Sequence, residues 1–310
     1  MEVIRDIAAF PHLSFPVVTS GTFDGVHIGH QKILKRVIER AKEKNGQSVV
    51  ITFWPHPRLV LFPDDNKLKL LSTIEERIEQ LESFGIDYLL IIPFTKEFSR
   101  TSSRTFITDI LVKALNTKLL VIGYDHRFGK NREGSFENLK ARSQQYGFEV
   151  EEIPRQDIDD VGVSSTKIRK ALENGDIETA SLYLGRRYTI TSEVVEGDKI
   201  GRTISYPTAN LAIPPAPKLI PANGVYAVWA HVEGTRYPAM MNIGVRPTVS
   251  GKNLTLEVHI IDFGSDIYGK SITVEFVEHL RNEKMFGGLE ELKSQLARDE
   301  EDARKVLHIV

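Results

Sequence analysis

The fold is decided first by residues 16–30, which read PVVTSGTFDGVHIGH. The apolar residues 16–19 predict a buried strand, and the amphipathic stretch 29–44 that follows predicts a helix. The segment is therefore expected to be the first strand, turn and helix of an α/β domain. The turn between them is the strongest candidate for a functional site in the chain.

The alternation of short apolar runs and longer amphipathic stretches continues to about residue 188. It predicts βα units around a parallel sheet, in a doubly wound, Rossmann-like α/β domain whose ligands bind at the carboxyl ends of the strands. The expected strands are 16–19, 48–52, 88–92, 119–122 and 148–153. The expected helices are 29–44, 73–84, 104–115 and 136–146.

After residue 188 the pattern changes to β-rich segments that Gly, Pro and Asn separate. This pattern predicts a small antiparallel β-barrel or sandwich, of which we favour the barrel, closed by a terminal helix over 289–307. We expect two domains, 1–185 and 186–310. The expected strands are 188–196, 224–231, 236–243, 255–262 and 271–279.

Composition excludes several classes of protein. The 310 residues include no Cys, which rules out disulfides, thiolate zinc sites and cysteine nucleophiles. The formal charge of -2 predicts no nucleic-acid partner. No apolar run approaches the roughly 20 residues of a membrane span, and the charged N-terminal stretch does not resemble a signal peptide. We expect a cytoplasmic protein with no membrane partner.

Two imidazoles mark the turn after the first strand. His27 and His30 fall on one face of the first helical turn, beside N–H groups that lack partners within the helix. A surface cap or two core histidines would explain this spacing alone. The functional alternative is a triphosphate site, in which Gly25 and Gly29 let the backbone approach and the histidines donate to charge that develops at the α-phosphate.

A second helix start, SSTKIR at 164–169, carries hydroxyls and two cations that suit phosphate oxygens. Its alternative interpretation is an N-cap followed by a solvated basic turn. Neither interpretation is favoured by this segment alone.

The β-rich half contains GDKIGRTISYPTANL at 197–211. If Pro207 begins an extended segment, Thr208 and Asn210 project to the same side. A hydroxyl and an amide carbonyl would hold Mg²⁺ weakly unless nucleotide phosphates completed its shell, which suits a metal that arrives with ATP. The preceding glycines could wrap phosphates or make a simple turn, and the turn is favoured because the segment is not a P-loop.

The segment 255–262 supplies a candidate general base. Alternation places Thr255, Glu257 and His259 on the polar face of the strand. The Glu257 carboxylate could accept a proton from an alcohol that attacks a γ-phosphate. The other interpretation is a solvated polar face.

These segments together carry a family resemblance. HIGH at 27–30 with SSTKIR resembles the nucleotidyltransferase superfamily, and FDGVH at 23–27, FWPHP at 53–57 and GYDHRFG at 123–129 closely resemble bacterial bifunctional riboflavin kinase/FMN adenylyltransferases, or FAD synthetases. PTAN, NGVY, NIG with RPT, and the Glu257 strand resemble the kinase module in the same order. The resemblance covers about 17–303.

The resemblance implies two activities and their site residues. The N-terminal half would transfer AMP from ATP to FMN, releasing pyrophosphate and FAD, and the C-terminal half would phosphorylate riboflavin to FMN with Mg-ATP; the flavins are substrates and products. Implied contacts with ATP in the N-terminal half are Thr22, Phe23, Asp24, Gly25, His27, His30, Ser164, Ser165 and Arg169, of which His27, His30 and Arg169 are catalytic. The acceptor or adenine would lie near Asp125, Phe128 and Arg132.

In the kinase half, the resemblance makes Glu257 the general base for the riboflavin 5′-hydroxyl and Thr208 and Asn210 the Mg-ATP ligands. Further ATP or flavin contacts are implied for Gly197, Gly201, Arg202, Asn242 and Arg281. The chain departs from the family pattern at Ser205, commonly Gly, and at His126, often Phe.

Three other functions are alternatives. An adenylyltransferase for another acceptor, such as nicotinate mononucleotide or phosphopantetheine, would not need Thr208, Asn210 and Glu257. A class I aminoacyl-tRNA synthetase shares HIGH but should carry an anticodon-binding extension and a basic surface. A flavin or nucleotide sensor would retain binding without turnover.

Overall fold

The computed structural model describes residues 1–64, 68–124, 129, 136–154, 162–197, 201, 205–214, 217–248 and 251–309. The chain forms two compact units, Met1–Ser165 and Thr166–Val310. The functional division at residue 185 stays a prediction.

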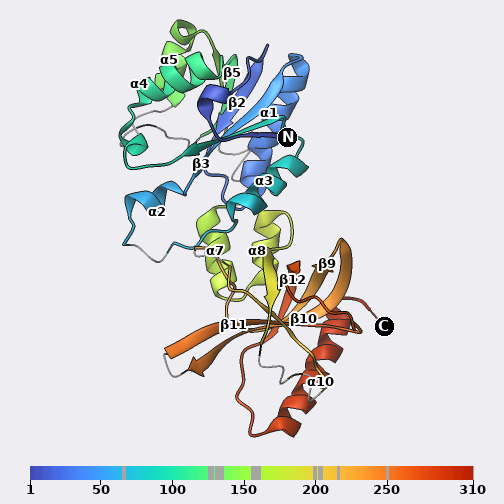
Figure 1. The fold of residues 1–310 in the computed structure, drawn as a ribbon. Coiled ribbons are helices and arrows are strands. Elements are labelled where there is room, and N and C mark those ends of the chain that lie inside the picture. Colours follow the sequence, from blue (N-terminus) through green and yellow to red (C-terminus); the bar gives the residue numbers. More distant parts are fainter. Residues whose placement is uncertain are drawn as a thin grey trace. The chain divides into compact units, whose positions relative to one another are not determined.

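A six-stranded parallel sheet forms the centre of the first unit (Figure 1). Its strand order, β1-β4-β3-β2-β5-β6, runs outward in both directions from β2, so the doubly wound prediction is confirmed. The switch point lies between β2 and β5, at whose carboxyl ends such folds bind ligands. The strands are β1 (Glu2–Ile4), β2 (Pro16–Ser20), β3 (Gln47–Trp54), β4 (Tyr88–Pro93), β5 (Leu119–Gly123) and β6 (Glu149–Ile153).

Alternating residues of the strands face two different helix layers. Val49 and Ile51 of β3 pack with the helical segment after residue 103 and with α5 (Phe136–Tyr146). Val50 faces the opposite layer, which holds α1 (Ile28–Glu43) and α3 (Ile74–Ser83). Because both faces are covered, the strands read as continuous apolar runs.

The helix expected over 104–115 is present, but most of it is a π-helix. A short α4 (Ser103–Thr105) leads into a π-helix, η3 (Phe106–Ala114). Buried residues recur there at 106–107, 110–111 and 115, a spacing that fits the wider π turn better than a period of 3.6. Short elements that the pattern did not predict are β1, η1 (Ile7–Ala9), α2 (Pro57–Leu61) and η2 (Phe98–Arg100).

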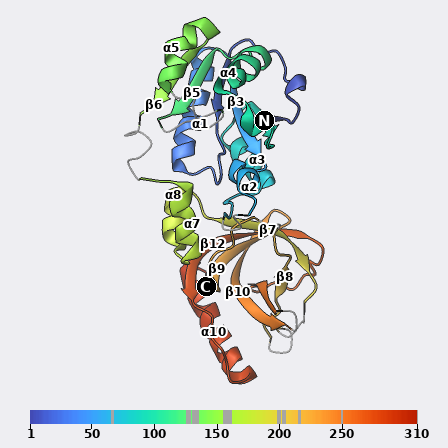
Figure 2. The ribbon, with the colours of Figure 1, turned by 90° about the vertical axis from the view of Figure 1, so that its left-hand side faces the viewer.

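The second unit is a closed antiparallel barrel, ordered β10-β11-β8-β7-β12-β9 (Figure 2). The barrel prediction is therefore confirmed over the sandwich. Leu256, Val258 and Ile260 alternate into its core, while the residues between them are half-buried. The strands are β7 (Thr189–Val195), β8 (Ala209–Leu211), β9 (Gly224–Val232), β10 (Thr235–Thr248), β11 (Gly251–Ile260) and β12 (Ser271–Arg281).

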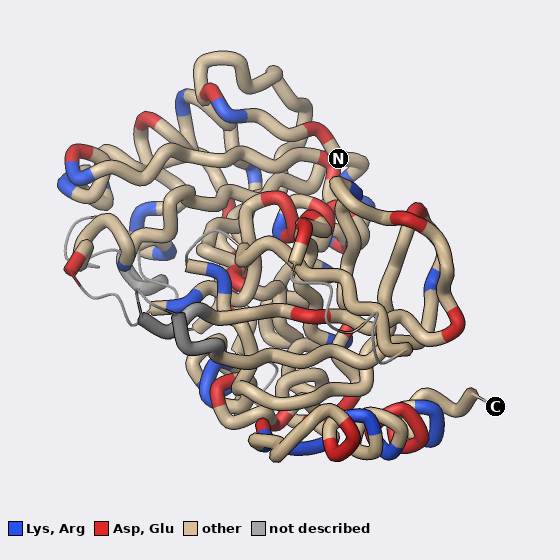
Figure 3. The backbone as a smooth tube through the Cα atoms, turned by 60° about the horizontal axis from the view of Figure 1, so that its bottom comes forward, with Lys and Arg blue, Asp and Glu red and all other residues tan. Residues whose placement is uncertain are grey.

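Three helices accompany the barrel. α7 (Ser165–Glu173) is joined to the loop before β9, because Ala222 N donates to Leu172 O, and α8 (Ile177–Leu184) packs against β12. The predicted terminal helix is α10 (Leu289–Val306), which buries Ala303 on the barrel. Its other faces carry interspersed acidic and basic residues, as the tube near the C-terminus in Figure 3 shows.

Candidate active sites

A buried carboxylate fixes the conformation of the turn after β2. Asp24 is 1 % exposed, and it accepts hydrogen bonds from Leu71 N (3.0 Å) and Ser72 N (3.1 Å). The Ser72 hydroxyl in turn accepts from Gly25 N at 3.1 Å. The chain before α3 therefore holds the centre of the FDGVH segment in one conformation.

Backbone strain is concentrated in the same turn. Phe23 has φ 47°, Gly25 has φ 78° and Val26 has φ 38°. Left-handed backbone is rare for a β-branched residue such as Val26 and costs about 1–3 kcal/mol. Such strain persists where surrounding contacts enforce it, which is common at functional sites.

The two histidines lie together, as the spacing predicts. His27 is the N-cap of α1, and its Nδ1 accepts from His30 N at 3.4 Å. The rings are stacked, with centroids 3.7 Å apart and planes 16° from parallel. His27 is only 8 % exposed, so the surface-cap interpretation is wrong, although the residue does cap the helix.

His30 lies in an environment that disfavours positive charge. Burial lowers its pKa well below the ordinary 6.5, and the neighbouring His27 and Arg77 lower it further. Its Nδ1 is buried and has no hydrogen-bond partner among the described residues. His30 is therefore a neutral imidazole at physiological pH.

Arg77 is a fully buried arginine on α3 that the motifs did not indicate as part of the site. Its Nη1 donates to the Thr52 hydroxyl at 3.4 Å, and its Nη2 lies 3.9 Å from the Asp24 carboxylate. A signal was present, since Arg77 follows Ile74 by three residues and precedes Leu81 by four, on the apolar face of the helix.

The SSTKIR segment meets the same turn through one residue. The Ser165 hydroxyl donates to Asp24 O at 3.2 Å, which joins the start of α7 to the FDGVH segment. Thr22 is also tied down, because its carbonyl accepts from the Thr52 hydroxyl. Ser164 precedes the helix and Arg169 belongs to the second unit, and their roles stay predictions. The expected acceptor residues Asp125, Phe128 and Arg132 lie outside the described residues.

A row of polar side chains crosses three strands of the barrel. Glu257 on β11 is directly opposite Asn210 on β8 and, on its other side, Asn242 on β10. Directly paired side chains have Cβ atoms about 4.5–5.5 Å apart. The polar-face alternation predicted for the Glu257 strand is confirmed, and the tertiary fold places two other predicted site residues beside it.

Two glycines that precede this row in the sequence lie too close to other atoms to carry a side chain. A Cβ at Gly197 would lie 2.1 Å from Asn210 Nδ2, and one at Gly201 would lie 2.1 Å from Tyr206 O. Gly201 O also accepts from Tyr206 N at 2.8 Å. Ser205 has φ 68°, which explains why a glycine is common there. Arg202 lies outside the described residues.

A cavity of about 440 Å³ opens beside Thr208. Its walls combine the strand residues Val194 and Val258 with Phe263 and Tyr268 from the segment after β11. A cavity lined by apolar and aromatic side chains with a few polar groups can hold a flat, partly polar ring system.

Arg281 makes a bidentate ion pair within the second unit. Its Nε and Nη2 lie 2.8 and 2.7 Å from the two carboxylate oxygens of Asp299 on α10. Gln295 also donates to this nearly buried carboxylate. The guanidinium thus fastens α10 to the end of β12, and its predicted flavin contact stays a prediction.

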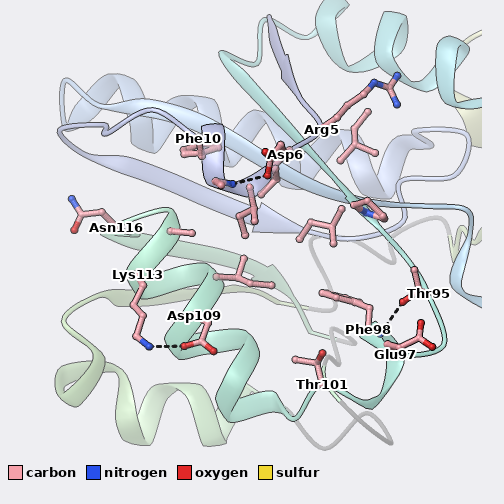
Figure 4. Close-up of a pocket in the computed structure, with 18 of the residues that line it drawn as sticks. Arg5, Asp6, Phe10, Thr95, Glu97, Phe98, Thr101, Asp109, Lys113 and Asn116 are labelled. Atoms are coloured by element: carbon pink, nitrogen blue, oxygen red, sulfur yellow. Dashed lines mark hydrogen bonds and ion pairs between the residues drawn. The ribbon is translucent and has the colours of Figure 1, made fainter.

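A larger groove, of about 1050 Å³, lies in the first unit along β4 and η3 (Figure 4). Its floor includes Leu90 and Ile92. Charged groups on its rim interact locally, since Lys113 pairs with Asp109 and Asp6 caps η1 (Figure 4). They do not converge on a common centre.

The described part of the chain contains neither a cluster of metal-ligating side chains nor a membrane-spanning helix. No three His, Asp or Glu side chains there are grouped as metal ligands. None of its helices is both long and apolar enough to cross a membrane.

Comparison with known proteins adds family information for both units. The FAD synthetase family model matches residues 11–167, and the riboflavin kinase model matches residues 184–307. The bifunctional riboflavin kinase/FMN adenylyltransferase of Escherichia coli K12 is 40% identical over 290 residues, which cover 93% of this chain and 92% of that protein. The protein of the same name from Listeria monocytogenes is 38% identical over 93% of this chain and 91% of its own length.

A solved structure has the same fold over nearly the whole chain. It is a crystal structure titled macrolide-efflux protein, from Streptococcus pneumoniae, with a TM-score of 0.87 and 31% identity. The match covers 97% of this chain and 98% of that one.

Proposed function

The chain belongs to the bifunctional riboflavin kinase/FMN adenylyltransferase family, and from this premise we propose how its residues divide the two reactions. One reaction phosphorylates riboflavin with ATP to give FMN and ADP. The other joins FMN to the AMP moiety of a second ATP, giving FAD and pyrophosphate. The FAD synthetase match over 11–167, together with the riboflavin kinase match over 184–307, argues against an adenylyltransferase for a different acceptor.

The kinase assignment rests on one observation, the row Asn210, Glu257 and Asn242 across β8, β11 and β10. The riboflavin 5′-hydroxyl oxygen attacks the γ-phosphorus, and the bond to the β,γ-bridging oxygen breaks. Glu257 accepts the hydroxyl proton, while ADP leaves with the electron pair. The adjoining cavity beside Thr208 takes the adenine between Phe263 and Tyr268.

Magnesium fits two oxygen donors of the proposed kinase site. Thr208 and Asn210 supply a hydroxyl and an amide carbonyl, both hard but uncharged ligands. The missing side chain of Gly197 leaves room for the Asn210 amide. When bound with ATP, the ion would neutralise phosphate charge in the transition state. The protein residues orient the nucleotide and remove the proton.

The adenylyl-transfer site is proposed at His27 and His30. A phosphate oxygen of FMN attacks the α-phosphorus, the bond to the α,β-bridging oxygen breaks, and pyrophosphate leaves. The N-terminus of α1 and the two imidazoles stabilise the charge that develops on the phosphate oxygens. Neutral His30 serves as a hydrogen-bond donor, and no covalent intermediate is required.

The other proposed ATP contacts are Thr22, Phe23, Gly25, Ser164, Ser165 and Arg169. Asp24 orders the turn through its hydrogen bond from Leu71 N. Both reactions consume ATP, so we place the enzyme in the cytoplasm. Its small-molecule partners are ATP, riboflavin, FMN, FAD and pyrophosphate.

The test separates the two reactions by product. Purified protein is incubated with riboflavin, ATP and Mg²⁺, and a parallel sample receives FMN in place of riboflavin. Chromatography should show FMN and FAD in the first sample and FAD in the second, and EDTA should stop product formation. Formation of FAD from FMN without any phosphorylation of riboflavin would contradict the kinase assignment.

A further inference from the structure

Arg77 is a buried charge that lacks full compensation. The side chain is 0 % exposed, and its Nε and Nη2 have no hydrogen-bond partner among the described residues. Burial lowers its pKa, and the nearby Asp24 carboxylate opposes this effect. Burying a guanidinium with unused donors is costly, and an apolar side chain of similar volume would fill the same space without that penalty.

The surroundings of Arg77 show what the charge acts on. Its Nη1 donates to the hydroxyl of Thr52, which itself donates to Thr22 O at the start of the FDGVH segment. Its Nη2 lies 3.9 Å from Asp24, at the centre of that segment. The guanidinium also lies over the Trp54 ring, 5.5 Å from the centroid. One buried group therefore supports the strained turn at two points.

We propose that Arg77 is a positioning residue for adenylyl transfer, which acts through Thr52, Asp24 and the paired histidines and does not touch the nucleotide. The proposal rests on the His27 and His30 site proposed above. Full burial separates Arg77 from any ligand, so its effect must pass through the residues that cover it.

The charge of Arg77 also bears on His30. The groups that act on this imidazole are His27 from α1 and Arg77 from α3, in addition to its burial, and Asp24 in the turn pairs with Arg77. The β3 side chains that contact Arg77, the Thr52 hydroxyl and the Trp54 ring, are uncharged. Burial and His27 are the larger influences that lower the pKa of His30, and the positive charge of Arg77 adds to them.

Two variants separate charge from geometry. Arg77→Met removes the charge with little change in volume, while Arg77→Lys keeps a charge but loses the planar fork. Arg142→Met changes an exposed arginine on α5 of the same unit and is the matched control. FMN adenylylation is measured against pH, and riboflavin phosphorylation by the same chain and the melting temperature report on folding.

We expect Arg77→Met to lower kcat for FMN adenylylation at least about tenfold, because small misplacements of reacting groups cost this much or more. The acid limb of its pH profile should move to higher pH, since one influence that lowers the His30 pKa is gone. Arg77→Lys should lose rate but keep the acid limb of the unmodified enzyme. Riboflavin phosphorylation and the Arg142→Met profile should not change.

An unchanged rate and pH profile in Arg77→Met overturns the proposal. So does an equal loss in the Met and Lys variants with the acid limb unmoved in both, because that is the behaviour of a merely structural residue. His30→Ala is run alongside. If it retains ordinary adenylylation, the histidine site itself is wrong, and this outcome is distinct from a failure of Arg77 alone.

Discussion

Glu257 and Asn210 lie directly opposite each other on the antiparallel strands β11 and β8. The two residues are far apart in the chain, yet the barrel register makes a carboxylate and an amide neighbours. A proton acceptor beside a metal-ligand candidate is the arrangement that phosphoryl transfer from Mg-ATP to an alcohol requires.

Glu257→Gln should suppress riboflavin phosphorylation by about 10²- to 10⁴-fold, the usual contribution of a general base. The amide is nearly isosteric but cannot accept the hydroxyl proton. Conversion of supplied FMN to FAD should continue, and separate assays with the two substrates measure this. Glu278→Gln, at an exposed position of β12, is the matched control. Normal FMN production by Glu257→Gln would rule out its role as the base.

Gly197→Ala should impair the kinase by displacing Asn210. The added Cβ would lie 2.1 Å from Asn210 Nδ2 and 2.4 Å from its Cγ, so the amide must move. We expect kcat for riboflavin phosphorylation to fall about tenfold or more, with a higher Mg²⁺ concentration for half-maximal rate.

Gly234→Ala is the control for this glycine. It meets no atom within 4 Å but has φ +81°, so it should cost about 1 kcal/mol of stability and leave both activities intact. Equal kinase loss in the two variants would indicate a general effect of stability and not the contact with Asn210.

His30→Ala should reduce FMN adenylylation by about 10²- to 10³-fold, the effect of losing one preorganised donor to developing charge. The variant supplied with riboflavin, ATP and Mg²⁺ should accumulate FMN, which chromatography detects. His12→Ala, an exposed histidine of the same unit, should form FAD normally. Ordinary FAD output from His30→Ala is the contrary result.

Asp299→Asn should destabilise the barrel unit by about 3 kcal/mol, since it leaves the partly buried Arg281 without its carboxylate partner. The free energy of unfolding in denaturant measures the change. Asp302→Asn, which is 60% exposed on the same helix, should have almost no effect. Similar stabilities for the two variants would show that the Arg281 pair does not anchor α10.

Glu151→Gln should give a pH-dependent loss of stability in the first unit. Burial alone would raise the pKa of Glu151, but hydrogen bonds from Arg40 and Arg36 outweigh it and lower the pKa below 4.5. A lowered folded-state pKa stabilises the protein above the unfolded value, and this stabilisation is lost as pH falls through the lowered pKa.

We therefore expect Glu151→Gln to be about 1 kcal/mol less stable than the unmodified protein at neutral pH, a value that allows for solvent screening. The difference should shrink as denaturant unfolding is repeated at pH values below 4.5. Glu149→Gln, at an exposed position of β6, should show no such trend. A difference that persists at low pH would mean that the ion pair is not its source.

Local pattern predicted the long elements well. The α5 bounds agree with the periodicity at both ends, and β2 and α1 lie where the strand-turn-helix pattern predicted them. Short elements such as β1 were not predicted, because three residues carry too little pattern. The pattern also did not show that the helix after Phe106 is of the π type, whose wider turn needs tertiary contacts to sustain it.

Site prediction failed where burial and register decide the outcome. Arg77 stands on the apolar face of α3, but the pattern does not show that its charge is fully buried beside Asp24 of the turn after β2. Ser165 reads as a cap, yet its hydroxyl reaches Asp24 O across most of the unit's sequence. These contacts depend on which distant segments become neighbours.

The sequence by itself determined the residue types at both sites. It also determined the 3.6- and 2-residue periods that indicate the two folds, because these periods are local properties of the backbone. Only the tertiary structure decided that Asn210, Glu257 and Asn242 form one row and that Arg77 is buried beside Thr52 and Asp24. The physical reason is that strand pairing and burial are set by hydrogen bonds and packing between residues far apart in the chain. The sequence thus supplies the two histidines of the HIGH segment, and the packing around them lowers the pKa of His30.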